Sequence, residues 1–286
     1  MARIRPERVS WGPIDAVVLG SVAVAACYGF PNLLWSGSIE SAQTYFLRTL
    51  VISLWLFVPT VMWLRTVRKA PLAQHWLPAD TVLRDAVVGV QLALIFAVVN
   101  GIGIKLLFER PFDQPAGEMF RVMRESYGTW DISLLVIGVA VLAPVAEEVF
   151  FRGMLYPAMR RYMGPFQAVI FNAALFAIAH GRNRAWGTFL LGLVASIMME
   201  YTGSLVVPIL LHVGTNFAFV AFLVRQGQLA RTMPMWLLML IFVVMNVHLF
   251  LAGKLLFGAR ERPESPSGAD PGATGGAAPR TAHGTD

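Results

Sequence analysis

The sequence has very little cysteine and few charged residues. Cys27 is the only cysteine among 286 residues, so the chain can form no intrachain disulfide and no cysteine-based metal site. Charged residues make up 14% of the chain and hydrophobic residues 56%, whereas a soluble domain typically has about 25% charged and about 45–50% apolar residues. This shortage of charge argues against a soluble globular domain and favours a polytopic membrane protein.

Several common functional motifs are also absent. The chain contains no GxxxxGK[ST], GxGxxG or HExxH pattern, so nucleotide hydrolysis and zincin chemistry lack their usual support. The net charge is +6, but the basic residues cluster at the ends of apolar runs, and no basic patch alternates with aromatic residues as single-stranded nucleic acids require. We therefore expect no nucleic-acid partner and interpret the positive charge as membrane orientation and contact with anionic lipid headgroups.

Long apolar runs account for most of the remaining sequence. A helix needs about 20 residues to cross a bilayer core of about 30 Å, and eight runs reach or approach this length. Their approximate spans are 14–35, 44–64, 82–108, 131–152, 166–181, 186–202, 204–223 and 234–257. The sequence therefore predicts an all-α fold, a polytopic membrane helical bundle with about eight transmembrane helices.

The distribution of basic residues predicts the orientation of this bundle. If the N-terminus is cytoplasmic, 13 of the 23 Lys and Arg residues lie in inner segments and 9 in outer ones, with Arg152 inside the membrane. This bias favours a cytoplasmic location for both termini. Because the composition is rich in Arg, Ala and Gly, we expect an integral protein of a bacterial inner (plasma) membrane.

Three domains are predicted along the chain. Residues 1–130 would hold three transmembrane helices and an outer amphipathic loop, which runs from Phe108 to Trp130. Residues 131–257 would form a catalytic helical core together with the last helix. Residues 258–286 are rich in Pro, Gly, Ala and Ser, and we expect them to form a disordered cytoplasmic tail.

Polar side chains interrupt three of the apolar runs at helical spacing. Glu148 and Arg152 lie four residues apart, as do Phe176 and His180, and His212 and Asn216. Residues four apart share a helix face. Ionisable groups are costly inside membrane helices and by default indicate a functional site that faces the bundle interior.

The first of these runs contains two adjacent acids with different predicted roles. Glu148 precedes Arg152 by four residues, which is the favourable order for an ion pair on one helix, so Arg152 would neutralise Glu148. Glu147 then has no partner on its own face and is a candidate general base. The alternative for Glu147 is snorkelling to the interface or a helix–helix hydrogen bond.

The other two runs supply imidazoles and an amide. His180 could be a core residue, a proton shuttle or a metal ligand, and Phe176 is most simply a packing residue. His212 and Asn216 carry N–H donors on one helix face, a combination that could stabilise an oxyanion. For Asn216 a helix–helix hydrogen bond is the alternative.

Two further buried candidates carry less specific signals. Asn172 and Glu200 lie within apolar runs, where each could support the site or join two helices.

The three motifs together point to a known family. Their order along the chain is Glu147-Glu148-x-x-x-Arg152, Phe176-x-x-x-His180 and His212-x-x-x-Asn216. In this order and spacing they resemble the signature of the CAAX-protease and bacteriocin-processing family of intramembrane proteases, which includes the type II CAAX prenyl endopeptidases. The similar part covers roughly Ile132 to Val224, and Gly203-Ser204-Leu205 resembles the usual entry into the third motif.

The resemblance implies an intramembrane endopeptidase. Glu147 and His180 would activate a water molecule for attack on a peptide carbonyl, His212 and Asn216 would stabilise the oxyanion, and Glu148 and Arg152 would support them. The family has been described both as metalloproteases and as metal-independent glutamate proteases.

A divalent metal such as zinc is one of these two options. Glu147, His180 and His212 would suffice as a His₂Glu ligand set, but they lie on three different helices and their spacing does not decide the matter. We favour water activation without a metal.

The predicted partners are the lipid bilayer and a peptide or membrane-protein substrate, which could be lipidated or carry a sorting signal. Two other functions compete with proteolysis: a non-catalytic immunity or scaffold protein of the membrane, and a small proton-coupled transporter. The absence of paired broken helices counts against the transporter. The sequence identifies neither the substrate nor the oligomeric state.

Overall fold

A computed structural model describes most of the apolar part of the chain. The described residues are 9–25, 41–72, 76–107, 122, 128–181, 184–224, 240, 244 and 247. The predicted tail lies outside them. So do almost all of the predicted outer loop and of the eighth span, 234–257.

All regular elements within the described residues are helices. They are α1 (Pro13–Val24), α3 (Ala42–Met62) with η3 (Trp63–Val67), α5 (Val82–Leu107), α7 (Thr129–Leu135), η4 (Val136–Leu142), α8 (Ala143–Glu148), η5 (Val149–Leu155), α9 (Tyr156–Arg160), α10 (Pro165–Ala179), α11 (Ala185–Thr202) and α12 (Val206–Val224). The elements labelled η are π-helical segments. The all-α fold predicted from the apolar runs is confirmed.

Four of these helices are long and apolar enough to cross a membrane. They are Ala42–Val67, Val82–Val99, Thr129–Arg160 and Ala185–Thr202, and three shorter apolar helices accompany them at Pro13–Ala23, Pro165–Ala179 and Val206–Ala221. The chain is therefore an integral membrane helical bundle. The count of eight spans stays a prediction, because the eighth is described at only three positions.

Local sequence signals set several helix ends. The Ser41 hydroxyl accepts a hydrogen bond from the Thr44 backbone N–H, which caps the N-terminus of α3. Proline opens α10 at Pro165, where the missing N–H costs nothing. Gly203 ends α11 with a φ of 64°, a left-handed conformation that favours glycine. Thus short-range chemistry places the turns between the predicted spans.

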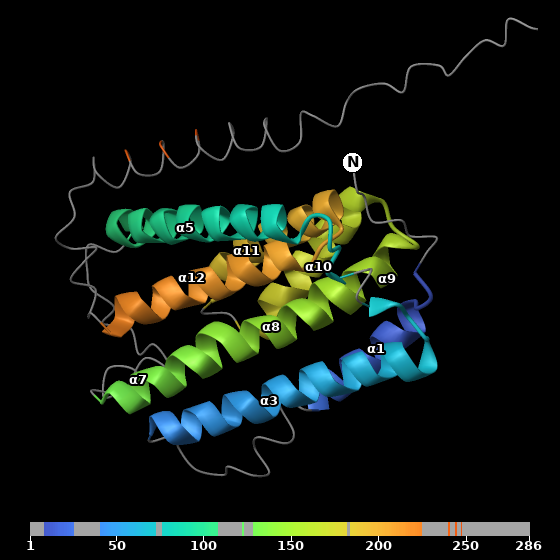
Figure 1. Cartoon of the computed structure of the whole chain (residues 1–286), viewed down its shortest axis with the longest axis horizontal. Helices are drawn as coiled ribbons and strands as arrows, with labels where there is room; N and C mark the ends of the chain where they lie inside the picture. Colours follow the sequence, from blue (N-terminus) through green and yellow to red (C-terminus); the bar gives the residue numbers. More distant parts are fainter. Residues whose placement is uncertain are drawn as a thin grey trace, which may run out of the picture.

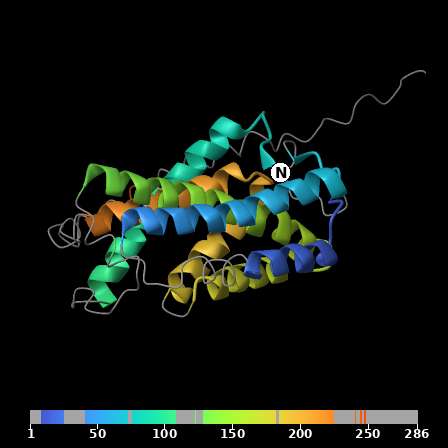
Figure 2. The ribbon, with the colours of Figure 1, turned by 90° about the horizontal axis from the view of Figure 1, so that it is seen from below.

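The helices lie roughly side by side, with their ends gathered at two poles (Figure 1). α5 packs along α12, α10 packs along α11, and α3 packs against α7 and α8. In Figure 2, α1 lies alongside α3, and α5 runs obliquely across the bundle. The continuous helical stretch Thr129–Arg160, which comprises α7 to α9, runs through the middle of this arrangement and contacts α3, α10, α11 and α12.

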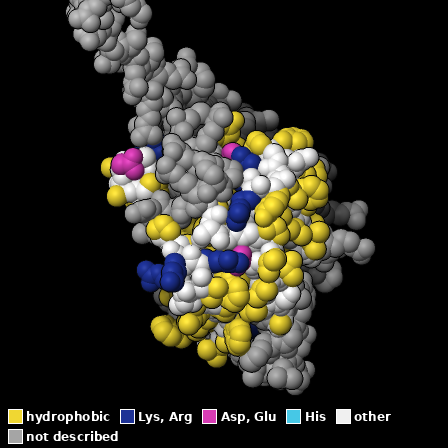
Figure 3. All heavy atoms as spheres, turned by 90° about the vertical axis from the view of Figure 1, so that its right-hand side faces the viewer, with side chains coloured by type: hydrophobic (Ala, Val, Ile, Leu, Met, Phe, Trp, Pro, Cys, Tyr) yellow, Lys and Arg dark blue, Asp and Glu magenta, His cyan; other side chains and the backbone are white. Residues whose placement is uncertain are grey.

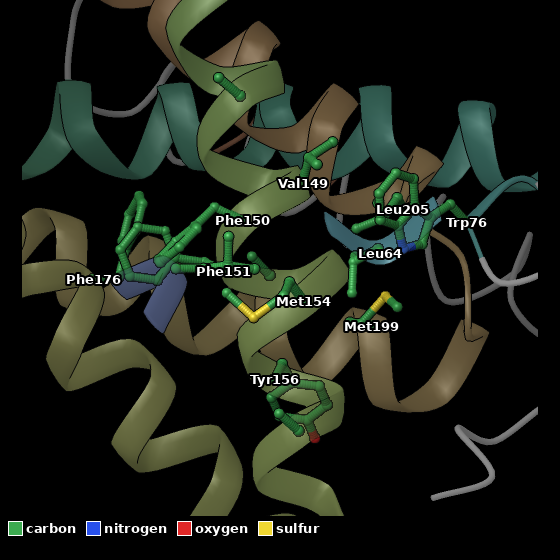
Figure 4. Packing of buried hydrophobic residues seen from close by; sticks show 14 of the residues in the cluster. Leu64, Trp76, Val149, Phe150, Phe151, Met154, Tyr156, Phe176, Met199 and Leu205 are labelled. Carbon is green, nitrogen blue, oxygen red and sulfur yellow. The ribbon is translucent and has the colours of Figure 1, made fainter. Parts of the chain in front are cut away.

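The largest core cluster surrounds the second half of this central helical stretch. Phe150, Phe151, Met154 and Tyr156 point into it, and they meet side chains from α10, α11, η3 and the turn before α12 (Figure 4). Because this core is packed on several sides of η5, the residues just before it are held rigidly in place. Those residues include Glu147 and Glu148.

Candidate active site

Three of the predicted site residues converge from three different helices. Glu147 lies near the end of α8, His180 is the C-cap residue of α10, and His212 lies in the middle of α12. The Glu147 Oε2 atom is 3.5 Å from His180 Nε2 and 3.9 Å from His212 Nε2. The side chain of Glu147 is 23% exposed and that of His180 is 16% exposed, although the Glu147 Oε2 atom itself is buried.

A second, fully buried group lies directly behind Glu147. Arg152 Nη1 donates to Glu148 Oε1 at 3.0 Å, which is the predicted ion pair between residues four apart. Arg152 Nη2 also donates to the Gly192 carbonyl of α11 at 3.1 Å. His212 Nδ1 lies 2.8 Å from the same Glu148 oxygen. Glu148 thus bridges Arg152 and His212, and as the carboxylate of an ion pair it accepts a hydrogen bond from the His212 ring.

The hydrogen bonds made by the two Nδ1 atoms fix the tautomers of both imidazoles. The partner of His180 Nδ1 is the Phe176 carbonyl oxygen at 2.8 Å, which can only accept, so Nδ1 carries a proton. The bond to Glu148 likewise places a proton on His212 Nδ1. Both Nε2 atoms therefore face Glu147 with a lone pair whenever the rings are neutral.

This geometry collects three acceptor atoms around one point. Glu147 Oε2 is buried and has no hydrogen-bond partner among the described residues, and the two Nε2 atoms are its nearest polar neighbours from α10 and α12. An additional proton on one of the three groups turns the repulsion between lone pairs into a charge-assisted hydrogen bond. The cluster is therefore suited to hold one proton and to pass it among an acid and two bases.

Phe176 is the packing residue predicted from its spacing. Its side chain is fully buried, and its ring meets the His212 ring edge to face at 5.6 Å and the His180 ring at 4.4 Å. The Arg152 guanidinium lies 4.4 Å from the same ring centroid, a favourable cation–π distance. Phe176 thus packs against both imidazoles and the Arg152 guanidinium.

The Asn216 side chain bonds to a neighbouring helix. Its Nδ2 donates to the Val139 carbonyl of η4 at 2.9 Å, which is the helix–helix hydrogen bond considered as the alternative for this residue. In the predicted pair of oxyanion donors, the His212 Nδ1–H and one Asn216 amide N–H are therefore already bonded to protein acceptors. The oxyanion role of Asn216 stays a prediction.

Two residues with weaker sequence signals turn out to join helices. Asn172 Nδ2 donates to the Phe151 carbonyl at 3.0 Å, and its Oδ1 accepts from Ser196 Oγ at 3.1 Å. Glu200 accepts from Arg160 at 2.8 Å and from the Tyr156 hydroxyl at 2.9 Å. Both residues hold η5 and α9 against α10 and α11, and neither contacts Glu147.

The sequence did not reveal two tryptophans that hold the same central helical stretch. Trp76 Nε1 donates to the Gly153 carbonyl at 3.3 Å, and Trp11 Nε1 donates to the Met154 carbonyl at 2.8 Å. Pro157 lacks the N–H that would bond Gly153 in a regular α-helix. This proline was the available signal, because a carbonyl freed in an apolar core requires a donor from elsewhere.

The same side chains were considered as metal ligands. As arranged here, no three His, Cys, Asp or Glu side chains among the described residues form a group that could hold a metal ion. The ligand set Glu147, His180 and His212 is thus not supported by this arrangement and stays a prediction.

Comparisons with known proteins bear on the same part of the chain. Residues 129–218 match a family model described as type II CAAX prenyl endopeptidase Rce1-like. This match runs from α7 into α12 and contains every predicted site residue, so the resemblance noted from the three motifs is confirmed over this segment.

One curated relative also aligns with the chain. It is an Escherichia coli protein described as an uncharacterized 24.3 kDa protein, and it is 33% identical over 88 residues. The alignment covers 29% of this chain and 41% of that protein, so the chain spans less than half of its relative's length. No solved structure matches significantly.

Proposed function

We propose that this chain, whose residues 129–218 belong to the Rce1-like family of CAAX-type proteases, is an intramembrane endopeptidase that hydrolyses a peptide bond with Glu147 and His180 as catalytic residues. The observation that carries this proposal is the Glu147 carboxylate, held 3.5 Å from one inward-facing imidazole nitrogen and 3.9 Å from another. A general base within reach of a water molecule, with a second group ready to return the proton, is what amide hydrolysis requires.

The reaction follows from where the protons lie. A water molecule bound by Glu147 and His180 loses a proton to this pair as its oxygen forms a bond to the scissile carbonyl carbon. The resulting tetrahedral intermediate carries a negative charge on oxygen. Collapse of this intermediate breaks the C–N bond, and the proton held by Glu147 and His180 passes to the leaving amine.

His212 would serve this reaction as an imidazolium. Its Nδ1–H is bonded to Glu148, so only Nε2, which faces Glu147, can donate to the oxyanion, and it can do so only when it carries the additional proton. The Glu148 carboxylate stabilises that positive charge and keeps the ring oriented, while Arg152 holds Glu148 in place through their ion pair. Glu148 and Arg152 are thus supporting residues.

The substrate would be a peptide or membrane protein that reaches the site within or at the surface of the bilayer. A lipidated C-terminus and an unlipidated sorting signal are the two substrate types that we consider. The site belongs to a bundle with four helices of membrane-spanning length, so a substrate with its own membrane attachment would arrive at a much higher effective concentration than a soluble one.

A test uses the full chain reconstituted in vesicles with a library of prenylated and unprenylated peptides, analysed by mass spectrometry of the products. We expect cleavage by the wild type and a fall of at least about 100-fold in kcat for Glu147→Gln and for His180→Ala. Asp80→Asn is the matched control, because it alters an exposed acid outside the site. Turnover that survives both site substitutions would rule out this mechanism.

Metal content measured on the same preparation separates the two proposed chemistries. Activity that persists after chelation, in protein free of bound transition metal, supports water activation by Glu147 and His180 alone. Activity lost on chelation and restored by one divalent ion would instead assign Glu147, His180 and His212 as ligands.

A further inference from the structure

One main-chain carbonyl near the site lacks its normal partner. In η4 the Ala143 N–H donates to the Gly138 carbonyl, five residues back. The next donor in this register would be residue 144, which would bond the carbonyl of Val139. Residue 144 is proline and has no N–H. The sequence therefore leaves the Val139 carbonyl without a main-chain donor in this register, inside a buried part of the bundle.

Asn216 supplies the missing donor from another helix. Its Nδ2 atom lies 2.9 Å from the Val139 oxygen, across a sequence separation of 77 residues. α12 packs directly against both η4 and α8, so this bond ties the two helices together beside the site. Without it the Val139 carbonyl would be buried and unsatisfied, a costly condition in a medium that offers no water.

The bond from Asn216 to Val139 joins the two helical stretches that carry Glu147 and His212. Val139 precedes Glu147 by eight residues on the same helical stretch, so the tie lies about two helical turns before the general base. Asn216 follows His212 by four residues and thus shares its helix face. A shift of η4 along α12 would therefore change the distance between Glu147 and the His212 Nε2 atom, now 3.9 Å.

We propose that Asn216 is a positioning residue: by satisfying the carbonyl that Pro144 frees at Val139, it fixes α8 against α12 and so holds Glu147 at its working distance from His212. This inference rests on the proposed protease function. It differs from the direct oxyanion contact that the family resemblance implies, and the two roles predict different behaviour when Pro144 is replaced.

Removal of the proline provides the test. Pro144→Ala restores an N–H at residue 144, and this N–H can bond the Val139 carbonyl in place of Asn216. We would prepare the full chain in detergent as wild type, Pro144→Ala, Asn216→Ala and the double variant, and measure thermal unfolding of each. We expect Asn216→Ala to lower the Tm by about 3 °C or more in the wild-type background and by less than half of that in the Pro144→Ala background.

Asn172→Ala serves as the matched control. It removes another buried Asn donor, one that bonds the Phe151 carbonyl, and Pro144→Ala should leave the effect of this change undiminished. Equal losses of Tm for Asn216→Ala in both backgrounds would overturn the proposed tie, and this result does not depend on any enzymatic activity. Asn216→Asp keeps the size of the side chain but places a second acceptor against the carbonyl, so we expect its Tm to fall at least as far.

Catalytic rates then distinguish positioning from oxyanion binding. A positioning role predicts that Pro144→Ala alone lowers kcat with little change in KM, because the new N–H competes with Asn216 for the Val139 carbonyl and weakens the tie between the helices. A direct oxyanion donor predicts that Pro144→Ala leaves kcat unchanged, because Asn216 is still present to bind the oxyanion, and this outcome would overturn the positioning role. If the wild type cleaves no peptide, the proposed protease function fails, while the unfolding measurements still decide whether the tie exists.

Discussion

Arg152 shows how a charge is tolerated inside this bundle. Its side chain and that of Glu148 are both completely buried, yet the guanidinium reaches a carboxylate, the Gly192 carbonyl and the face of Phe176. His212 completes the group from α12. The energetic benefit of such a buried group lies less in its net attraction than in the cost of leaving any one member alone.

The first prediction follows from this interdependence. Arg152→Ala leaves the Glu148 carboxylate buried without its cation, and we expect a loss of about 3–5 kcal/mol in unfolding free energy. The double variant Glu148→Gln/Arg152→Met removes both charges and should be less destabilised than Arg152→Ala alone. Equilibrium unfolding in mixed detergent and denaturant measures both. A loss below about 1 kcal/mol for Arg152→Ala, the value typical of an exposed pair, would contradict the burial described here.

At the scale of the element, the central helical stretch Thr129–Arg160 departs from α-helical geometry on both sides of α8. The π-helical segments η4 and η5 flank α8, which carries Glu147 and Glu148. Prolines follow both segments, at residues 144 and 157, and side chains of Asn216 and Trp76 donate to nearby carbonyls. Such π segments are often found at functional sites. Here they make the position of Glu147 depend on donors from other helices.

Trp11 provides the second prediction. Its indole is 1% exposed and donates to the Met154 carbonyl, so the segment before α1 supports η5. Trp11→Phe keeps an aromatic ring but loses the N–H, and we expect a loss of about 1–3 kcal/mol because a buried carbonyl loses a donor. Trp186→Phe is the control, since Trp186 is 73% exposed. Thermal unfolding of the two variants decides the matter, and similar Tm values would argue against a specific role for Trp11.

The close approach of α5 and α12 provides the third prediction. A Cβ atom added to Gly214 would lie 2.5 Å from the Cβ of Ala93, which is too close without movement of one helix. Gly214→Ala should therefore cost about 1–3 kcal/mol of stability. Because Gly214 lies two residues from both His212 and Asn216, activity should fall as well.

A reciprocal change tests this contact. Ala93→Gly removes the opposing methyl group and should restore much of the stability and activity lost in Gly214→Ala. Gly187→Ala is the control, because nothing lies within 4 Å of the Cβ built there, and alanine in a helix interior is more stable than glycine by about 0.5–1 kcal/mol. Failure of Ala93→Gly to restore stability would show that these two helices can separate freely.

At the scale of the whole molecule, basic residues gather at one pole of the bundle. One pole collects the C-terminal end of η3, the start of α5 and the end of α9, and Figure 3 shows several Lys and Arg side chains on it. The basic residues of these segments are Arg65, Arg68, Lys69, Arg84, Arg160 and Arg161. An Asp15 carboxylate raises the pKa of Arg68 through a direct hydrogen bond, so this residue stays charged. From the positive-inside rule we expect this pole to face the cytoplasm.

The fourth prediction concerns this orientation. In a Cys27→Ser background, a single cysteine replaces either Asp80, between η3 and α5, or Thr129, at the start of α7; both residues are exposed. An impermeant maleimide should label the Thr129→Cys variant in intact bacterial spheroplasts and the Asp80→Cys variant only in inverted membrane vesicles. The opposite labelling pattern would reverse the proposed topology and place both termini outside.

The sequence by itself determined the helices and the chemistry that they carry. Apolar runs of membrane-spanning length demand backbone hydrogen bonds within each segment, so helices follow without knowledge of any neighbour. The i,i+4 pairing of Glu148 and Arg152 is equally local, since helix geometry alone brings the two side chains together. For the same reason the motif residues could be assigned to shared faces before any contact between helices was known.

Only the tertiary structure decided which side chains meet across helices. The bond from His212 to Glu148, which sets the tautomer of the ring, joins residues 64 apart in the chain, and that from Asn216 to Val139 joins residues 77 apart. Such contacts depend on the rotation and axial shift of one helix against another. The π segments beside α8 alter that register, and packing contacts such as that between Gly214 and Ala93 set the separation. A sequence pattern within one helix does not determine the register or the separation of two helices, because both are properties of the packed interface.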